Sequence, residues 1–171
     1  MAEEIVNKVA KSGIQTVEIE KYFPETPCEI IDIAENLWQG IALKEKDFRE
    51  FVKENDWSKY DGKAVAVHCS VDAIVPTWAY MLLASSLQGH AARVVFGNAE
   101  TLKTVLIIEK LRSEIDPTNF EDARIVVKGC SEKAVSEAAF VELINILQDK
   151  AKMIMYGEPC STVPVWKRPK K

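Results

Sequence analysis

The chain has 171 residues, of which 47% are hydrophobic and 28% are charged. This length suits one domain, and the composition excludes collagen, a coiled-coil rod and wholesale disorder. The longest apolar runs are far too short to span a bilayer, and the acidic start, Met1-Ala2-Glu3-Glu4, is unlike a secretory signal. We therefore expect a cytoplasmic protein without a membrane partner, and the net charge of -4 argues against nucleic acid as a partner.

The N-terminal region, residues 1–37, is expected to contain a short helix and edge strands. Residues 3–11 have the pattern of a short leading helix. Residues 14–20 alternate apolar and polar side chains, which is typical of an edge strand, and residues 29–33 form a second strand-like stretch.

Residues 38–97 form a first predicted αβαβ unit. Apolar side chains at helical spacing, Phe48, Phe51 and Val52, indicate an amphipathic helix. Short, fully apolar runs indicate buried strands, and Gly89 ends the second helix. The predicted elements are a helix at 44–55, a strand at 64–67, a helix at 78–88 and a strand at 93–96.

Residues 98–157 form a second predicted αβαβ unit, followed by a tail. Asn98 is a suitable cap for the first helix of this unit. The predicted elements are a helix at 99–114, a strand at 124–128, a helix at 134–149 and a strand at 153–156. The last residues, 158–171, are expected to form a basic, proline-containing tail.

The two units match one another at an offset of 60 residues. Ten of the 54 positions from 44 to 97 are identical to the residue 60 positions later, where chance would give roughly three. Either the chain contains an internal duplication, or two similar units converged on one pattern. In both cases the two halves are expected to share one secondary-structure plan.

Alternating strands and helices predict an α/β fold with parallel strands. Right-handed crossovers then favour a three-layer, doubly wound, mostly parallel sheet of five or six strands in a single domain. In such a sheet, ligands bind beyond the carboxyl ends of the strands.

Three cysteines occupy equivalent places in this predicted sheet. Cys69 and Cys130 follow apolar strands and precede Ser, and Cys160 lies three residues beyond Gly157, which ends the last strand. We therefore expect the three thiols at one edge of the sheet. Further candidate metal ligands beside them are His68, Asp72 and Glu158. The residues expected to line a pocket there are Trp78, Ser70, Ser131 and Ser161.

Each of these residues also has a purely structural interpretation. Cysteine is often a small buried residue, and Cys28, in a strand-like stretch, is expected to be simply a small apolar side chain. His68 fits a core or hydrogen-bonded position, Asp72 fits a helix cap, and Trp78 fits helix packing.

The chemistry available to three thiols is metal binding or nucleophilic catalysis. Three thiolates completed by a carboxylate, an imidazole or water suit zinc or an iron–sulfur cluster. A single thiolate at a helix N-terminus, Cys69 or Cys130, suits sulfur transfer or redox chemistry. The sequence has no G-x-G-x-x-G, Walker lysine loop or G-x-S-x-G, so ordinary dinucleotide binding and P-loop hydrolysis are not supported.

Five segments carry a resemblance to a known family: residues 43–49, 68–82, 95–97, 128–131 and 155–164. They resemble a bacterial family catalogued as domain of unknown function 2480, and the resemblance covers nearly the whole chain. It implies no particular activity, only a loose association with gene neighbourhoods for iron–sulfur cluster assembly. The resembling segments include Cys69, Cys130 and Cys160, and His68 is less typical of the family pattern than Cys69.

Three functional hypotheses follow. The first is a cytosolic protein whose three thiols bind a metal or an iron–sulfur cluster, as an accessory to assembly proteins. The second is a thiol enzyme, with Cys69 or Cys130 as a persulfide-carrying or redox nucleophile. The third is a scaffold with structural cysteines, whose tail docks on a partner or a second subunit. A homodimer is the default expectation for the assembly.

Overall fold

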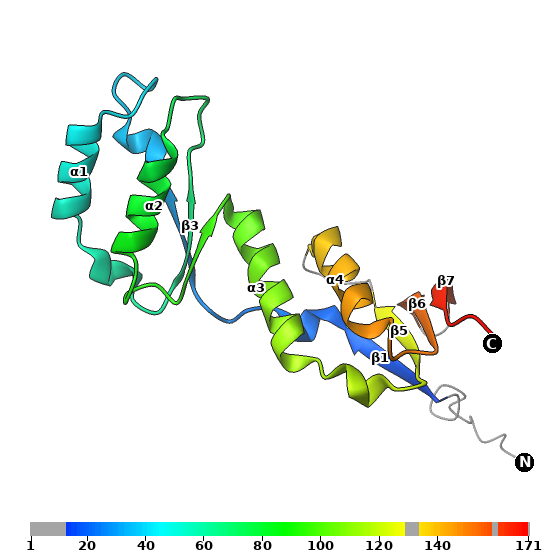
Figure 1. Ribbon diagram of the computed structural model, residues 1–171. Helices are drawn as coiled ribbons and strands as arrows, with labels where there is room; N and C mark the ends of the chain where they lie inside the picture. Colours follow the sequence, from blue (N-terminus) through cyan, green and yellow to red (C-terminus); the bar gives the residue numbers. More distant parts are fainter. Residues whose placement is uncertain (1–12, 129–133, 159–160, 171) are drawn as a thin grey trace, which may run out of the picture. The chain divides into compact units, whose positions relative to one another are not determined.

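The protein was analysed as a computed structural model, which describes residues 13–128, 134–158 and 161–170. The chain divides into two compact units, each with its own β-sheet (Figure 1). Unit 1 consists of Met1–Pro24 and Leu106–Lys171, and unit 2 is the continuous stretch Glu25–Val105. In sequence, unit 2 is therefore inserted into unit 1.

Unit 2 is a three-stranded parallel sheet with helices on one face. The strands follow the order β2-β3-β4. Each crossover joins a strand to its next neighbour, and both crossovers proceed across the sheet in the same direction. Because such crossovers are right-handed, both crossover helices lie on the same face of the sheet (Figure 1). The elements are β2 (Cys28–Asp32), η2 (Ile33–Asn36), α1 (Glu45–Glu54), η3 (Trp57–Tyr60), β3 (Ala64–His68), α2 (Thr77–Ser86) and β4 (Arg93–Phe96).

The core of unit 2 follows from the apolar spacing of its helices. Phe48 and Val52 lie one turn apart on α1, and Leu83 lies on the buried face of α2. These side chains share one buried cluster with Val65 and Val67, which point to the same face of β3. The predicted amphipathic helix at 44–55 and buried strand at 64–67 are thus confirmed.

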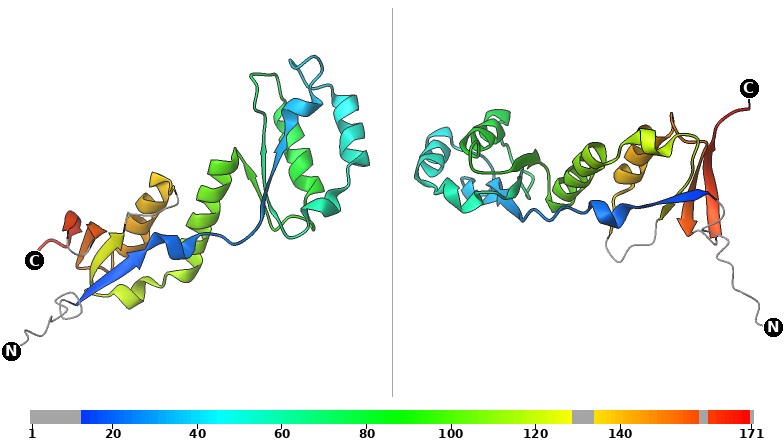
Figure 2. Two further views of the ribbon diagram at one scale, coloured as in Figure 1. Left: turned by 180° about the vertical axis from the view of Figure 1, so that it is seen from behind. Right: turned by 90° about the horizontal axis from the view of Figure 1, so that it is seen from below.

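Unit 1 is a four-stranded mixed sheet in the order β1-β5-β6-β7. Its first three strands are parallel, and β7 is antiparallel to β6. The second half of α3 (Ala99–Glu114), which begins in unit 2, packs with α4 in one cluster (Figure 2). The remaining elements are β1 (Ile14–Glu18), η1 (Ile19–Tyr22), η4 (Pro117–Phe120), β5 (Arg124–Lys128), α4 (Glu137–Leu147), β6 (Met153–Glu158) and β7 (Ser161–Lys167).

The secondary structure of unit 2 recurs in unit 1 at an offset of 60 residues. η3 and η4 begin at residues 57 and 117, β3 and β5 at 64 and 124, α2 and α4 at 77 and 137, and β4 and β6 at 93 and 153. The expectation of a shared secondary-structure plan is confirmed. Its origin by internal duplication stays a prediction.

Side-chain contacts repeat at the same offset. Tyr80 of α2 meets Phe96 of β4 edge to face, with ring centroids 5.0 Å apart. The equivalent residues, Phe140 of α4 and Tyr156 of β6, make the same contact at 5.6 Å with the two aromatic types exchanged. A helix–strand contact is therefore preserved although neither residue is identical.

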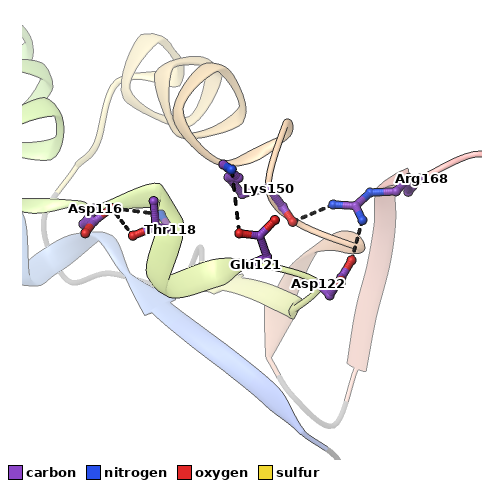
Figure 3. Close-up of polar contacts among 6 residues, drawn as sticks. All are labelled: Asp116, Thr118, Glu121, Asp122, Lys150 and Arg168. Carbon is purple, nitrogen blue, oxygen red and sulfur yellow. Dashed lines mark hydrogen bonds and ion pairs between the residues drawn. The ribbon is translucent and has the colours of Figure 1, made fainter.

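Polar turn contacts repeat as well. The Asp116 carboxylate accepts hydrogen bonds from the Thr118 N–H at 2.9 Å and hydroxyl at 2.7 Å (Figure 3). Sixty residues earlier, the Asp56 carboxylate accepts the equivalent bonds from Ser58 at 3.0 Å and 2.6 Å. Asp56 caps the short helix that leads into β3, and Asp116 caps the one that leads into β5.

The α/β class and the mostly parallel pairing are confirmed, but the prediction of one sheet with five or six strands is wrong. The described strands form two sheets, of four and three strands. The N-terminal strands cause the difference, because β1 pairs with β5 and β2 pairs with β3. Each thus starts a separate sheet. The prediction of a single domain stays a prediction.

The segment predicted as a basic tail forms part of unit 1. Ser161–Lys167 is β7, an apolar run with polar ends that pairs antiparallel with β6. Beyond it, the Arg168 guanidinium pairs with the Asp122 carboxylate and donates to the Lys150 carbonyl oxygen at 2.7 Å (Figure 3). Ion pairing and strand pairing therefore fix the chain to residue 168. The expected leading helix at 3–11 lies outside the described residues.

Candidate functional site

Cys69 directly follows β3, at the carboxyl end of the sheet of unit 2. Its side chain is half-buried and packs against the core of this unit. The thiol donates to the Val71 carbonyl oxygen at 3.4 Å. The predicted place of Cys69 at a strand end is confirmed.

Asp32 organises the backbone around Cys69. It ends β2 and lies beside His68 of β3 in the strand register. Its carboxylate accepts hydrogen bonds from the N–H groups of Ala34 and Ser70, both at 3.0 Å. Desolvation raises the pKa of this carboxyl, but the Ser70 side chain, the two N–H groups and His68 lower it, and the net pKa lies below its ordinary value.

Replacing Asp32 by Ala is expected to lower the free energy of unfolding by about 1–3 kcal/mol at pH 7, because two N–H groups lose a charged acceptor. Since the folded pKa is depressed, this contribution is present above the unfolded pKa of about 4 and is lost as the pH falls through the folded value. Urea unfolding of both proteins from neutral to acidic pH measures the difference. The Asp32→Asn variant keeps an acceptor oxygen and should lose less. A difference that grows towards acidic pH would contradict the role assigned to Asp32.

The other candidates near Cys69 are placed as follows. Asp72 is exposed, and its predicted capping role is wrong, because α2 has Pro76 at its N-cap. Trp78 meets Phe48 edge to face at 6.0 Å, and Arg49 lies over its ring at 5.2 Å. The packing interpretation of Trp78 is thus confirmed.

Cys28 lies in a strand, as its sequence context predicts. It lies at the exposed start of β2, and its thiol donates to the Thr26 carbonyl oxygen at 3.5 Å. The first buried residue of β2 is Ile31.

The equivalent edge of unit 1 is polar and hollowed. Lys128 ends β5 and is the register partner of Glu18, the last residue of β1. Its ammonium nitrogen lies 3.7 Å from a carboxylate oxygen of Glu18 and 3.7 Å from one of Glu158. These side chains, with Ile19 and Glu20, line a hollow of about 90 Å³.

The carboxylates of Glu18 and Glu158 both form ion pairs with Lys128. Glu18 also pairs with Lys21 at 3.2 Å. The hydrogen bond and charge of Lys21, followed by the charge of Lys128, hold the pKa of Glu18 below its ordinary value. Around the hollow, one ammonium group thus pairs with carboxylates from β1 and β6.

Two of the three cysteines predicted to form the site come shortly after strands that end at this edge. Cys130 comes two residues after β5 ends at Lys128, and Cys160 comes two residues after β6 ends at Glu158. β5 and β6 are neighbouring parallel strands. Cys130, Ser131 and Cys160 themselves lie outside the described residues, while Ser161 begins β7 and is exposed.

Cys69 was expected at this edge as part of a single sheet, but the described strands form two sheets. Cys69 follows a strand of unit 2, whereas Cys130 and Cys160 follow strands of unit 1. Across residues 13–128, 134–158 and 161–170, no three His, Cys, Asp or Glu side chains are grouped to hold a metal ion. A site shared by all three cysteines stays a prediction.

The comparisons with known proteins decide the family. Residues 3–168 match the family described as protein of unknown function (DUF2480). The chain belongs to this family. No curated protein and no solved structure matches the chain. The predicted resemblance is confirmed over nearly the whole sequence.

In this member of the DUF2480 family, sequence reasoning missed the acidic residues that end β1 and β2. Glu18 and Asp32 each stand between two buried apolar residues, in Val17-Glu18-Ile19 and Ile31-Asp32-Ile33. Each sequence carries a strand directly into a short helix. The repeated apolar–acidic–Ile pattern is the signal that would have identified both carboxylates.

No helix among the described residues is both long enough and apolar enough to cross a membrane.

Proposed function

We propose that the protein binds a metal ion or an iron–sulfur cluster at the carboxyl edge of the unit 1 sheet, through Cys130 and Cys160. The supporting observation is the pairing of β5 with β6, because each strand leads within two residues to one of these cysteines. Neighbouring strands are about 4.8 Å apart. Two cysteines that follow adjacent parallel strands in sequence suit a site that shares one ion.

The charges at this edge suit such a site. Glu158 immediately precedes the second cysteine segment and offers a carboxylate as a further ligand. In the described structure that carboxylate pairs with Lys128. Metal binding would exchange this ion pair for a metal–oxygen bond and leave the Lys128 ammonium beside the thiolates, where a cation favours their ionised form.

A site with two thiolates and one carboxylate leaves a position open on zinc or iron. This suits a protein that receives and passes on a metal or cluster rather than one that holds it permanently. We therefore propose an accessory role in iron–sulfur cluster assembly, with assembly proteins as partners. We also propose a cytoplasmic location, because thiols stay reduced in the cytoplasm.

The test is the metal and acid-labile sulfide content of protein purified without oxygen. Wild type is expected to carry zinc, or iron with sulfide, and Cys130→Ser and Cys160→Ser are each expected to lose it. Cys28→Ser and Cys69→Ser are matched controls, because these cysteines belong to unit 2. Retention of metal in the Cys130 and Cys160 variants, or a metal-free wild type after reconstitution, would overturn the proposal. Loss in Cys69→Ser as well would restore the three-thiol site.

A thiol enzyme is the second candidate, and Lys128 favours it. Its ammonium lies at the same edge, two residues before Cys130. A nearby cation lowers the pKa of a thiol and activates it as a nucleophile. This candidate predicts metal-free protein in which Cys130 is alkylated much faster than Cys28, with the rate falling in Lys128→Met. Uniformly slow alkylation would favour the scaffold hypothesis instead.

A further inference from the structure

The outer edges of the two repeated sheets differ. In unit 1, β7 pairs antiparallel with the outer side of β6. In unit 2, the equivalent strand is β4, and no described strand pairs with its outer side. An edge strand of this kind presents a row of backbone N–H and C=O groups that another strand can pair with.

The side chains beside the β4 edge are apolar and exposed. Phe96 at the end of β4 is 69% exposed, and Met81 on α2 is 67% exposed. The equivalent residues of unit 1, Tyr156 and Val141, are 42% and 61% exposed. Tyr156 is the residue that lies opposite Val163 of β7 in the strand register. The repeat thus indicates what the edge of unit 2 is suited to accept: an antiparallel strand with apolar side chains.

We propose that a second copy of the chain occupies this edge, with β4 paired antiparallel to β4 of the other copy around a two-fold axis. The two three-stranded sheets then form one six-stranded sheet. Met81 of each copy, on the helix next to β4, extends the contact beyond the strands. The surface is self-complementary, as a two-fold dimer requires.

The sequence of β4 favours a second copy over an unrelated strand. β4 reads Arg-Val-Val-Phe, an apolar run with a basic residue at one end. β7, the strand that fills the equivalent edge, also has an apolar centre and a basic end, Lys167. In a two-fold pairing centred on Val95, Val94 lies opposite Phe96 of the second copy, and Arg93 lies opposite Gly97. Apolar residues then face one another, and no like charges are directly opposed.

The test is sedimentation equilibrium of the full chain under reducing conditions, from about 1 to about 200 µM, a range that brackets micromolar affinity. Wild type is expected to be a dimer at the upper end. Phe96→Lys and Met81→Lys are each expected to raise the dissociation constant at least tenfold. Tyr156→Lys and Val141→Lys are the matched controls, because they make the same changes at the unit 1 edge that β7 already covers.

The controls also separate association from folding. Phe96→Lys loses the ring contact with Tyr80, and Tyr156→Lys loses the equivalent contact with Phe140. Thermal unfolding should therefore change similarly in both variants, while only the first weakens the dimer. A second measurement is amide hydrogen exchange, which should slow at residues 93–96 as concentration rises. A wild type that stays monomeric, or a dimer equally affected by both sets of variants, would overturn the proposal.

Discussion

Replacing Leu143 by Ala is expected to lower the free energy of unfolding by about 3 kcal/mol, within the range of about 2–5 kcal/mol for a fully buried leucine. Leu143 lies on α4 and is completely buried. It belongs to the single cluster that joins α4 to Ile125 and Ile154 of the unit 1 sheet. Removing three side-chain carbons there leaves a cavity between helix and sheet.

The equivalent variant, Leu83→Ala, is expected to have a similar effect through the separate cluster of unit 2. Urea unfolding followed by circular dichroism measures both. Val141→Ala is the control on α4, because this exposed side chain should change stability by no more than about 0.5 kcal/mol. If Leu143→Ala were as mild as this control, the packing of α4 on the sheet would be wrong.

Replacing Gly157 by Ala is expected to cost about 2 kcal/mol or more. Gly157 has a φ of +124°, a region that residues with a Cβ rarely adopt. An added Cβ would lie 2.6 Å from the carbonyl oxygen of Ser161. Because the added Cβ would be fixed to the backbone of β6 and the carbonyl belongs to the backbone of β7, neither can rotate away, and the strand pairing must shift.

Gly89→Ala is the control for this prediction. Gly89 also has a positive φ, of +84°, but no atom lies within 4 Å of an added Cβ. Its substitution should therefore cost only about 1 kcal/mol. Thermal or urea unfolding of both variants gives the comparison. Equal effects would mean that the close approach of Ser161 to Gly157 does not exist in solution.

Local patterns in the sequence were sufficient for most elements but not for their pairing. The strands at 64–68 and 124–128 were predictable because short apolar runs bury both faces. The pairing of β1 with β5 was not predictable, since Thr16 and Val126 are register partners that no local pattern relates. The rule that consecutive elements are neighbours favoured one sheet, and β1 does not follow it.

The candidate site was predictable only in part for the same reason. The position of Cys69 after a strand depends on local pattern, whereas its distance from Cys130 depends on which sheet each strand joins. The error at the C-terminus was of another kind. Pro164 and the basic residues suggested a tail, but proline is compatible with an edge strand, and the apolar run from Val163 to Trp166 pairs with β6.

The order of the strands along the chain has a consequence for synthesis on the ribosome. Unit 2 is one continuous stretch, so its three strands emerge one after another and can pair as soon as Val105 has left the exit tunnel. β1 emerges before all of them, but its partner β5 begins only at Arg124. Among the described strands β1 is made first, and its apolar side chains stay uncovered while the sheet of unit 2 forms. A nascent chain that ends before β5 therefore contains one complete unit and the unpaired strand β1.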